Sequence, residues 1–215
     1  MPGPTVEFWQ QRFESRDIPW DRGSASPRLV HLLESGRLAS EPARPCRILV
    51  PGCGSGHEVE LLARSGFRVV AIDYAPAAVE QTRQRLQRLM QSPDGARLVS
   101  AEVVQADVLA WSAPAPFDAV YEQTCLCALH PDHWIAYASQ LRAWLRPGGV
   151  LHALFMQALR PQAAPGELLG PPYHCDLTAM RALFASSHWQ WPAPPYPTVP
   201  HPIGHHEIAV ELARR

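Results

Sequence analysis

Residues 47–57 read Arg-Ile-Leu-Val-Pro-Gly-Cys-Gly-Ser-Gly-His. The apolar run 48–50 ends at a Pro-Gly pair, which predicts a short buried strand followed by a turn. Gly52, Gly54 and Gly56 then alternate with small side chains before a segment with the apolar spacing of a helix. Glycines let the backbone turn sharply and let a ligand approach without interference from Cβ atoms. A glycine loop between a strand and a helix therefore predicts a ligand site at the end of the first strand.

Strands and helices alternate along the rest of the chain. Further strands are predicted at 67–72, 98–105, 117–121, 150–155 and 208–212, and helices at 57–65, 76–90, 131–145 and 176–185. This alternation is typical of βαβ units, in which helices cover both faces of a parallel sheet. The predicted fold class is α/β: a doubly wound, mostly parallel seven-stranded sheet of Rossmann-like type, with an antiparallel edge strand near the C-terminus.

The composition is that of one globular domain spanning residues 1–215, since 47% of the residues are hydrophobic and 18% charged. All 19 basic residues are arginines and the net charge is −1, which argues against binding to nucleic acid or a membrane surface. No apolar run reaches the roughly 18 to 20 residues of a membrane span, and residues 1–20 lack the apolar centre of a signal peptide. Five cysteines without an export signal favour a reduced, cytoplasmic chain.

Acidic residues follow the second and third predicted strands. The carboxylate of Asp73 can accept from both hydroxyls of a ribose, and the adjacent Tyr74 is assigned to the same ligand. Asp107 can accept from an adenine amino group. The dinucleotide fingerprint needs its third glycine at position 57, which is a histidine here. The spacing therefore favours S-adenosylmethionine over NAD, because no pyrophosphate has to lie on the helix N-terminus.

Four stretches of the chain, in a fixed order, carry a resemblance to a known family. They are Phe-Trp-x3-Phe at 8–13 with Ile-Pro-Trp-Asp-Arg-Gly at 18–23, Leu-Val-Pro-Gly-Cys-Gly-Ser-Gly-His at 49–57, Tyr-Glu-Gln-Thr-Cys-Leu-Cys-Ala-Leu at 121–129, and Gly-Pro-Pro-Tyr at 170–173. The sequence resembles the class I S-adenosylmethionine-dependent methyltransferases, and within them the thiopurine and thiol S-methyltransferases, which include plant thiol and halide methyltransferases.

The resemblance implies that residues 1–30 form a helical lid over the cofactor. Trp9 and Trp20 match two aromatic positions of that lid, and Phe13 stands where the plant members have a third tryptophan. Tryptophan faces attract a cation such as a sulfonium by about 0.5–2 kcal/mol each. Alternatively, Phe8, Trp9 and Phe13 are the apolar face of an amphipathic helix packed on the core, and both interpretations can hold.

The resemblance also assigns residues around the cofactor and the acceptor. Val108 lies with Asp107 at the adenine edge, and Gln123 matches a plant tyrosine near the methionine half of the cofactor. Met156 stands where halide-methylating members have a tyrosine. This replacement favours sulfur or apolar acceptors over halides, because methionine offers a soft and polarizable surface.

Further candidates lie on the acceptor side. Glu122 ends the fourth strand, where it could attract the sulfonium, position the methionine amine or accept a proton. Tyr173 and His130 could orient an acceptor, and Cys127 is a candidate for the pocket wall or the core. The long connection 157–175 is expected near the acceptor pocket.

Two groups of histidines and cysteines invite a metal interpretation. They are Cys125, Cys127, His130 and His133, and near the C-terminus His201, His205 and His206. The first spacing matches no common zinc framework, in which two to four residues separate the paired cysteines. No metal site is therefore predicted.

The predicted function is methyl transfer from S-adenosylmethionine to the sulfur of a small thiol by a monomer. A thiol has a pKa near 8.5, so a few per cent is ionised at neutral pH and a dedicated base is not required. The alternatives are an O- or N-methyltransferase acting on a natural product, a methyltransferase of tellurite or selenium species, and a non-catalytic cofactor-binding protein. An NAD-dependent oxidoreductase is a more distant alternative.

Overall fold

The computed structural model describes residues 3–93, 100–160 and 167–215. The start of the predicted strand 98–105 and the middle of the connection 157–175 lie outside these residues, as do the first two residues of the predicted lid. None of the helices in the described ranges has the length and hydropathy needed to cross a bilayer.

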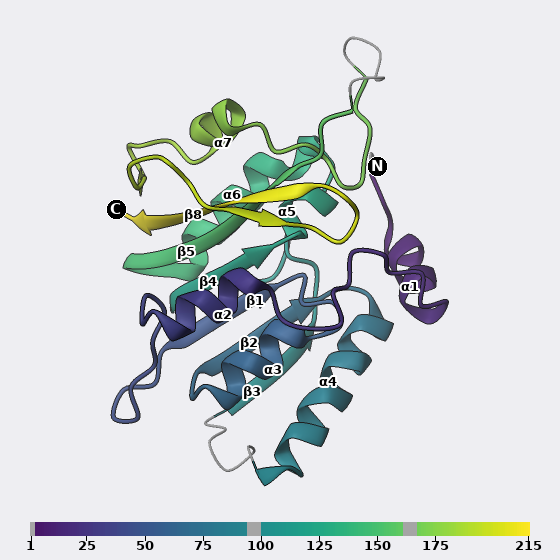
Figure 1. Cartoon of the computed structure of the whole chain (residues 1–215), viewed down its shortest axis with the longest axis vertical. Coiled ribbons are helices and arrows are strands. Elements are labelled where there is room, and N and C mark those ends of the chain that lie inside the picture. Colours follow the sequence, from purple (N-terminus) through teal and green to yellow (C-terminus); the bar gives the residue numbers. More distant parts are fainter. Residues whose placement is uncertain (1–2, 94–99, 161–166) are drawn as a thin grey trace.

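The centre of the molecule is an eight-stranded sheet in the order β3-β2-β1-β4-β5-β8-β6, with β7 pairing beside β8 (Figure 1). The strands are β1 Arg47–Pro51, β2 Arg68–Asp73, β3 Ser100–Gln105, β4 Phe117–Gln123, β5 Leu145–Gln157, β6 Trp189–Gln190, β7 Thr198–Pro200 and β8 His206–Arg214. β1 to β5 are parallel, whereas β8 runs antiparallel to β5, β6 and β7. The predicted α/β class is thus confirmed. The count is eight rather than the predicted seven, and the sequence signal for the three-residue strand β7 is hidden among prolines.

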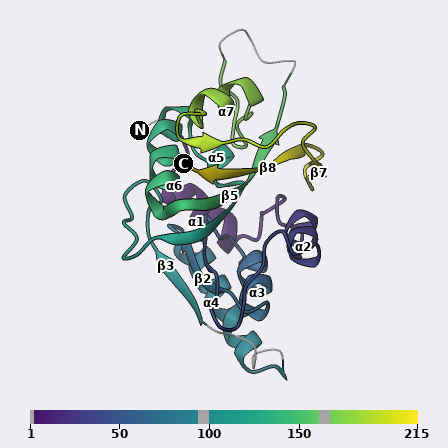
Figure 2. The same ribbon diagram turned by 90° about the vertical axis from the view of Figure 1, so that its left-hand side faces the viewer.

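Helices cover both faces of this sheet (Figure 2). They are α1 Val6–Glu14, α2 Pro27–Glu34, α3 His57–Arg64, α4 Pro76–Met90, α5 Cys125–Ala128, the 3-10 turn η2 Pro131–His133, α6 Trp134–Trp144 and α7 Leu177–Leu183. Side chains of successive strand residues point to opposite faces, so Ile48 and Val50 belong to the core under α2, α3 and α4, and Leu49 to the core under α6 and α7. The predicted helix 131–145 is divided, because η2 precedes α6.

The start of β5 differs from the expectation. Residues 146–149 were expected to end a helix, with a strand beginning at Val150. Instead β5 already pairs with β4 at Leu145, and the register shifts before Val150 pairs with Ala119. The extra residues are held in place because the Arg146 guanidinium donates to Asp118 at 2.7 Å. This contact joins residues far apart in the sequence, and local patterning does not reveal it.

Candidate functional site

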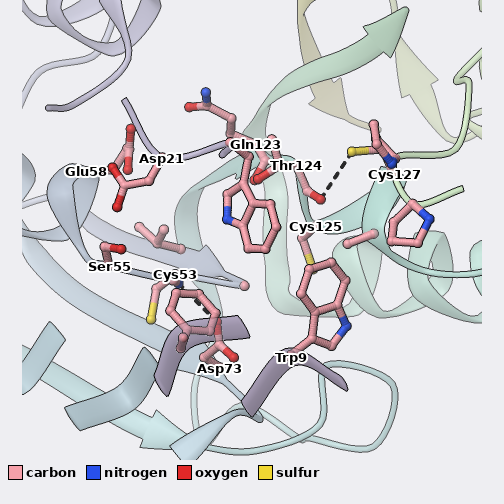
Figure 3. A pocket seen from close by; sticks show the side chains of 18 of the residues that line it. Trp9, Asp21, Cys53, Ser55, Glu58, Asp73, Gln123, Thr124, Cys125 and Cys127 are labelled. Carbon is pink, nitrogen blue, oxygen red and sulfur yellow. Dashed lines mark hydrogen bonds between the residues drawn. The ribbon is translucent and has the colours of Figure 1, made fainter. Parts of the chain in front are cut away.

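A cavity of about 390 Å³ opens at the carboxyl ends of the parallel strands. Its walls come from the glycine loop after β1, the ends of β2 and β4, α5, and the N-terminal segment (residues 3–30). Figure 3 shows Asp73 and Trp9 in one part of this cavity and Gln123 and Cys127 in another. Open α/β sheets bind ligands in this crevice beyond the strand ends.

The glycine loop has a backbone conformation that other residues adopt only with strain. Gly52, Gly54 and Gly56 have φ values of +60°, +52° and +77°. A Cβ on Gly56 would lie 2.6 Å from Oγ1 of Thr82, and one on Gly52 would lie 2.9 Å from Cβ of Cys125. The loop is therefore packed from behind while its front lines the cavity.

Asp73 holds this loop in place and faces the cavity. Its Oδ2 accepts from the amide of Gly54 at 3.0 Å, and its Oδ1 accepts from the amide of Ala75 at 3.0 Å. Burial raises the pKa of Asp73, and these backbone hydrogen bonds oppose that change. A carboxylate oxygen has two acceptor sites, so the group keeps capacity for ligand hydroxyls.

The neighbouring strand ends complete this side of the cavity. Tyr74 lines it and donates from its hydroxyl to the carbonyl of Pro4 at 3.3 Å. Asp107 and Val108 also line it, and Oδ1 of Asp107 accepts from the amide of Leu109 at 2.8 Å. The residues predicted for ribose and adenine are therefore close together in one cavity.

The aromatic residues of the N-terminal segment line the cavity and also pack against the start of α4. Trp9 and Trp20 line the cavity, with their rings edge to face at 5.4 Å. Phe13 also lines it but is only 5% exposed, because it packs with Ala75 and Ala78 at the start of α4. One face of α1 is therefore a packing face and a pocket wall at once.

The opposite wall is apolar and contains sulfur. Cys127 and Met156 are buried and line the cavity together with Pro171 and Pro172. The thiol of Cys127 donates to the carbonyl oxygen of Thr124 at 3.2 Å. Gln123 contributes an amide to the same wall.

The structure places Glu122 behind this wall rather than in the cavity. Tyr121 and Gln123 line the cavity, and alternation along β4 turns the side chain between them to the other face of the sheet. There Glu122 is 1% exposed and accepts from the amide of Leu126 at 2.7 Å through Oε1, while Oε2 has no hydrogen-bond partner. Glu122 is therefore not among the residues that line the cavity, and the structure gives no support to its predicted contact with the cofactor.

Tyr173 and His130 are also outside the set of lining residues. Their rings contact each other edge to face at 5.4 Å, and the amide of Tyr173 donates to the carbonyl of Cys127 at 2.7 Å. Gly170 makes room for the Tyr173 ring, since a Cβ there would come within 2.4 Å of it. This pair therefore packs behind the wall that contains Cys127.

The position of Glu122 leads to a prediction about stability. Burial raises the pKa of Glu122 to about 7. At a pH between the ordinary pKa of a glutamate and 7, the folded protein therefore keeps a proton that the unfolded chain releases. The resulting loss in the free energy of unfolding is absent at pH 4, grows as the pH rises, and reaches about 3 kcal/mol at pH 8. Glu122→Gln keeps an acceptor for the Leu126 amide and removes the charge. Urea unfolding should show this variant to be more stable than the parent at pH 8 and equally stable at pH 4.

Glu102→Gln is the matched control, because it makes the same change on an exposed side chain of β3. An equal gain for Glu122→Gln at both pH values would show that the carboxyl of Glu122 does not titrate in this way.

An ion pair between the N-terminal segment and α3 escaped the sequence reasoning. Nε2 of His57 lies 2.9 Å from Oδ1 of Asp21, and both residues line the cavity. His57 holds the pKa of Asp21 well below its usual range. Glu58 extends this connection, since its Oε1 accepts from the amide of Ser26 at 2.9 Å. The sequence offered two signals for this contact: the Trp-Asp dipeptide at 20–21, and the histidine at position 57, where the dinucleotide fingerprint has its third glycine.

Arg22 was likewise missed, and His201 was considered only as a metal ligand, yet both line the cavity. Among the residues that the structure describes, no three His, Cys, Asp or Glu side chains are grouped to hold a metal ion.

The cavity suits an adenosine that carries a positively charged sulfur. A buried carboxylate that retains acceptor capacity stands at the end of β2, beside a loop whose backbone is open to the ligand. Two tryptophan rings of the N-terminal segment line the same space.

Comparisons with known proteins agree with this geometry. The family model "Thiopurine S-methyltransferase (TPMT)" matches residues 5–210. The chain is 29% identical over 170 residues to "Probable thiol methyltransferase 2" of Arabidopsis thaliana, covering 79% of this chain and 68% of that protein. It is 30% identical over 192 residues to a thiopurine S-methyltransferase of Xanthomonas euvesicatoria pv. vesicatoria, covering 86% and 84%.

Among solved structures, the chain resembles the 1,6-didemethyltoxoflavin-N1-methyltransferase of Burkholderia thailandensis, with a TM-score of 0.72, 21% identity and coverage of 98% and 86%. It also resembles the N-methyltransferase NodS of Bradyrhizobium japonicum, with a TM-score of 0.69, 19% identity and coverage of 98% and 99%. At these identities the two structures establish the fold.

Proposed function

Because the chain belongs to the thiopurine S-methyltransferase family and is an S-adenosylmethionine-dependent S-methyltransferase, we propose that it methylates the sulfur of a small thiol in the cavity at the ends of β1, β2 and β4. The observation that carries this proposal is the division of the cavity. A ribose-type carboxylate and a glycine loop form one wall, and buried sulfur and apolar side chains form the other.

The residues of the first wall would hold the cofactor. Asp73 would accept from the ribose hydroxyls, and Asp107 with Val108 would contact the adenine. The glycine loop would lie along the methionine half, which Gln123 would reach from the opposite wall, and Trp9 and Trp20 would present ring faces to the positive charge. When bound, S-adenosylmethionine supplies a methyl group already activated on a sulfonium sulfur.

The second wall would hold the acceptor. Met156 and Cys127 give it a soft, polarizable surface that suits sulfur. Holding the acceptor in line with the methyl group is the protein's main contribution, and such alignment can supply about 7–11 kcal/mol. The nearest sequence candidate for a base, Glu122, lies behind the wall, which is consistent with an acceptor that ionises without one.

The N-terminal segment would act as the lid. Three contacts hold it across the cavity mouth: the Asp21–His57 pair, the hydrogen bond from Tyr74 to Pro4, and a hydrogen bond at 2.8 Å from the amide of Ala77 to Oε1 of Gln10. A lid of this kind excludes water and orders the reactants.

Three further points belong to the proposal. The N-terminal segment supplies the covering wall of the cavity, so the proposed site needs no second chain, and we propose a monomer. All five cysteines are free thiols, which supports a reducing compartment such as the cytoplasm. The net charge of −1 gives no electrostatic basis for a nucleic-acid partner.

A panel of acceptors tests the function. Purified protein and S-adenosylmethionine would be mixed with hydrosulfide, small aliphatic thiols, a thiopurine, iodide, tellurite, and oxygen and nitrogen acceptors. S-adenosylhomocysteine should form above background with the thiols, together with the matching methyl sulfides. Turnover with only an oxygen, nitrogen or tellurium acceptor would assign the enzyme to one of the alternatives.

A further inference from the structure

The part of the cavity farthest from Asp73 also holds polar side chains, beside its apolar wall. In the sheet order, β2 and β5 are three strands apart, which corresponds to about 14 Å at the usual strand spacing. At this far end Met156 of β5 pairs with Glu207 of β8. Arg22 of the N-terminal segment, Gln123 at the end of β4 and His201 after β7 line the cavity there. We call these three lining residues the Arg22 subsite.

The Arg22 guanidinium is fixed in position but has spare hydrogen-bonding capacity. One of its terminal nitrogens donates to the carbonyl of Pro200 and lies 3.5 Å from Oε2 of Glu207. The Nε atom of Arg22 is buried and has no hydrogen-bond partner. The side chain as a whole is 16% exposed, so the guanidinium is largely shielded from bulk water while it lines the cavity.

The only carboxylate paired with Arg22 in the described part of the chain is a weak counter-charge. Glu207 is 0% exposed, its Oε1 has no partner, and its Oε2 accepts from Nε2 of Gln123 at 3.4 Å. Burial raises the pKa of Glu207 to about 8, which favours its protonated form. Glu207 therefore balances the guanidinium charge only in part.

The other ionisable groups around this end do not supply that missing negative charge. Asp21 is paired with His57, and burial raises the pKa of Glu58. His201 is 6% exposed with an unpartnered Nδ1, and burial together with the Arg22 charge lowers its pKa to about 4. The imidazole is therefore neutral at pH 7 and can donate or accept a hydrogen bond.

We propose that the Arg22 subsite is an anion-binding site that holds the acceptor as a thiolate, with Arg22 as the residue that favours the ionised form. The inference rests on the proposed S-methylation and specifies its acceptor site. His201 and the Gln123 amide offer hydrogen bonds beside the cation. A cation in a partly desolvated site favours the charged form of a neighbouring thiol.

The same arrangement favours release of the product. The thiolate sulfur gives its electron pair to the methyl carbon, the bond from that carbon to the sulfonium sulfur breaks, and the proton has already gone to solvent. Both products, a thioether and S-adenosylhomocysteine, lack a charged sulfur. The attraction between Arg22 and the acceptor sulfur is therefore lost when transfer is complete.

The decisive measurement uses thiocyanate as a sulfur anion in the presence of S-adenosylhomocysteine, so that no methyl transfer occurs. Calorimetry should show thiocyanate binding to the parent protein and at least tenfold weaker binding to Arg22→Gln. Arg22→Lys should recover part of the affinity because it keeps the charge. Arg88→Gln is the control, since it removes the same charge from an exposed position on α4.

Kinetics provide the second arm. In Arg22→Gln the KM for a small thiol should rise at least tenfold, and the apparent pKa in the kcat profile should move up toward that of the free thiol, whereas affinity for S-adenosylhomocysteine should change less than threefold. A purely structural role for Arg22 would not move the pH profile. If Arg22→Gln does not fold, His201→Ala tests the same subsite.

The outcomes separate the two proposals. Unchanged thiocyanate binding in Arg22→Gln would overturn the anion site. Weaker binding of S-adenosylhomocysteine alone would overturn it too, because Arg22 would then be a ligand of the cofactor carboxylate. If the parent protein binds thiocyanate but methylates no thiol, the proposed function is wrong while the anion site remains.

Discussion

Asp73→Ala should bind S-adenosylhomocysteine about 100-fold more weakly than the parent protein. The Asp73 carboxylate is buried at the end of β2 and retains acceptor capacity toward the cavity. Hydrogen bonds to a charged group contribute about 1.5–3 kcal/mol each, so losing two to a ribose costs about 3 kcal/mol at the lower end of this range, which corresponds to roughly this factor. Isothermal titration calorimetry measures it directly. Asp73→Asn, which keeps one acceptor oxygen, should have intermediate affinity.

The variant also loses two hydrogen bonds from backbone amides, and Asp176→Ala controls for that loss. Asp176 accepts from the amides of Thr178 and Ala179 at 2.8 and 3.1 Å, but at the start of α7 rather than beside the cavity. Asp176→Ala should lose stability without losing affinity. Affinity of Asp73→Ala within threefold of the parent would place the ribose elsewhere.

Gly56→Ala should destabilise the fold by about 3 kcal/mol and abolish measurable cofactor binding. The alanine would adopt a left-handed backbone conformation, which costs roughly 1–2 kcal/mol. Its Cβ would also collide with Thr82, which is fully buried in α4, and overpacking of this kind costs about 1–3 kcal/mol. The loop must shift to relieve the collision, and the shift moves the backbone that faces the ligand.

Gly66→Ala separates these two contributions. Gly66 has φ of +86°, but a Cβ there would meet no atom within 4 Å. Urea unfolding should therefore show the smaller, conformational cost in Gly66→Ala and the sum of both costs in Gly56→Ala. Equal losses in the two variants would mean that contact with Thr82 contributes nothing.

Local signals predicted the fold well where one residue determines an element boundary. The helix predicted at 76–90 is α4, Pro76–Met90, because proline is favoured in the first helical turn. The strand–glycine–helix unit and Asp73 were likewise predictable, since each depends on a few consecutive residues. The cavity residues carried by family motifs, such as Trp9, Trp20 and Met156, also line the pocket.

The failures share a physical cause, which is that the deciding contact is distant in sequence. Glu122 was assigned to the cofactor from its place at a strand end, but the alternation of side chains along β4 turns it to the opposite face of the sheet. The Asp21–His57 and Arg22–Glu207 pairs join the N-terminal segment to α3 and to β8. The local sequence around each partner does not reveal which distant residue it contacts.

The contacts that Arg22 and Arg28 make with Glu207 and Glu211 have a consequence for biosynthesis. The ribosome makes the arginines of these pairs early, and their glutamates lie on β8, which is inserted between β5 and β6. A nascent chain that has not released β8 from the exit tunnel therefore has an unfinished pocket. Bound S-adenosylmethionine can therefore stabilise the native state only after β8 has been synthesised and has left the tunnel.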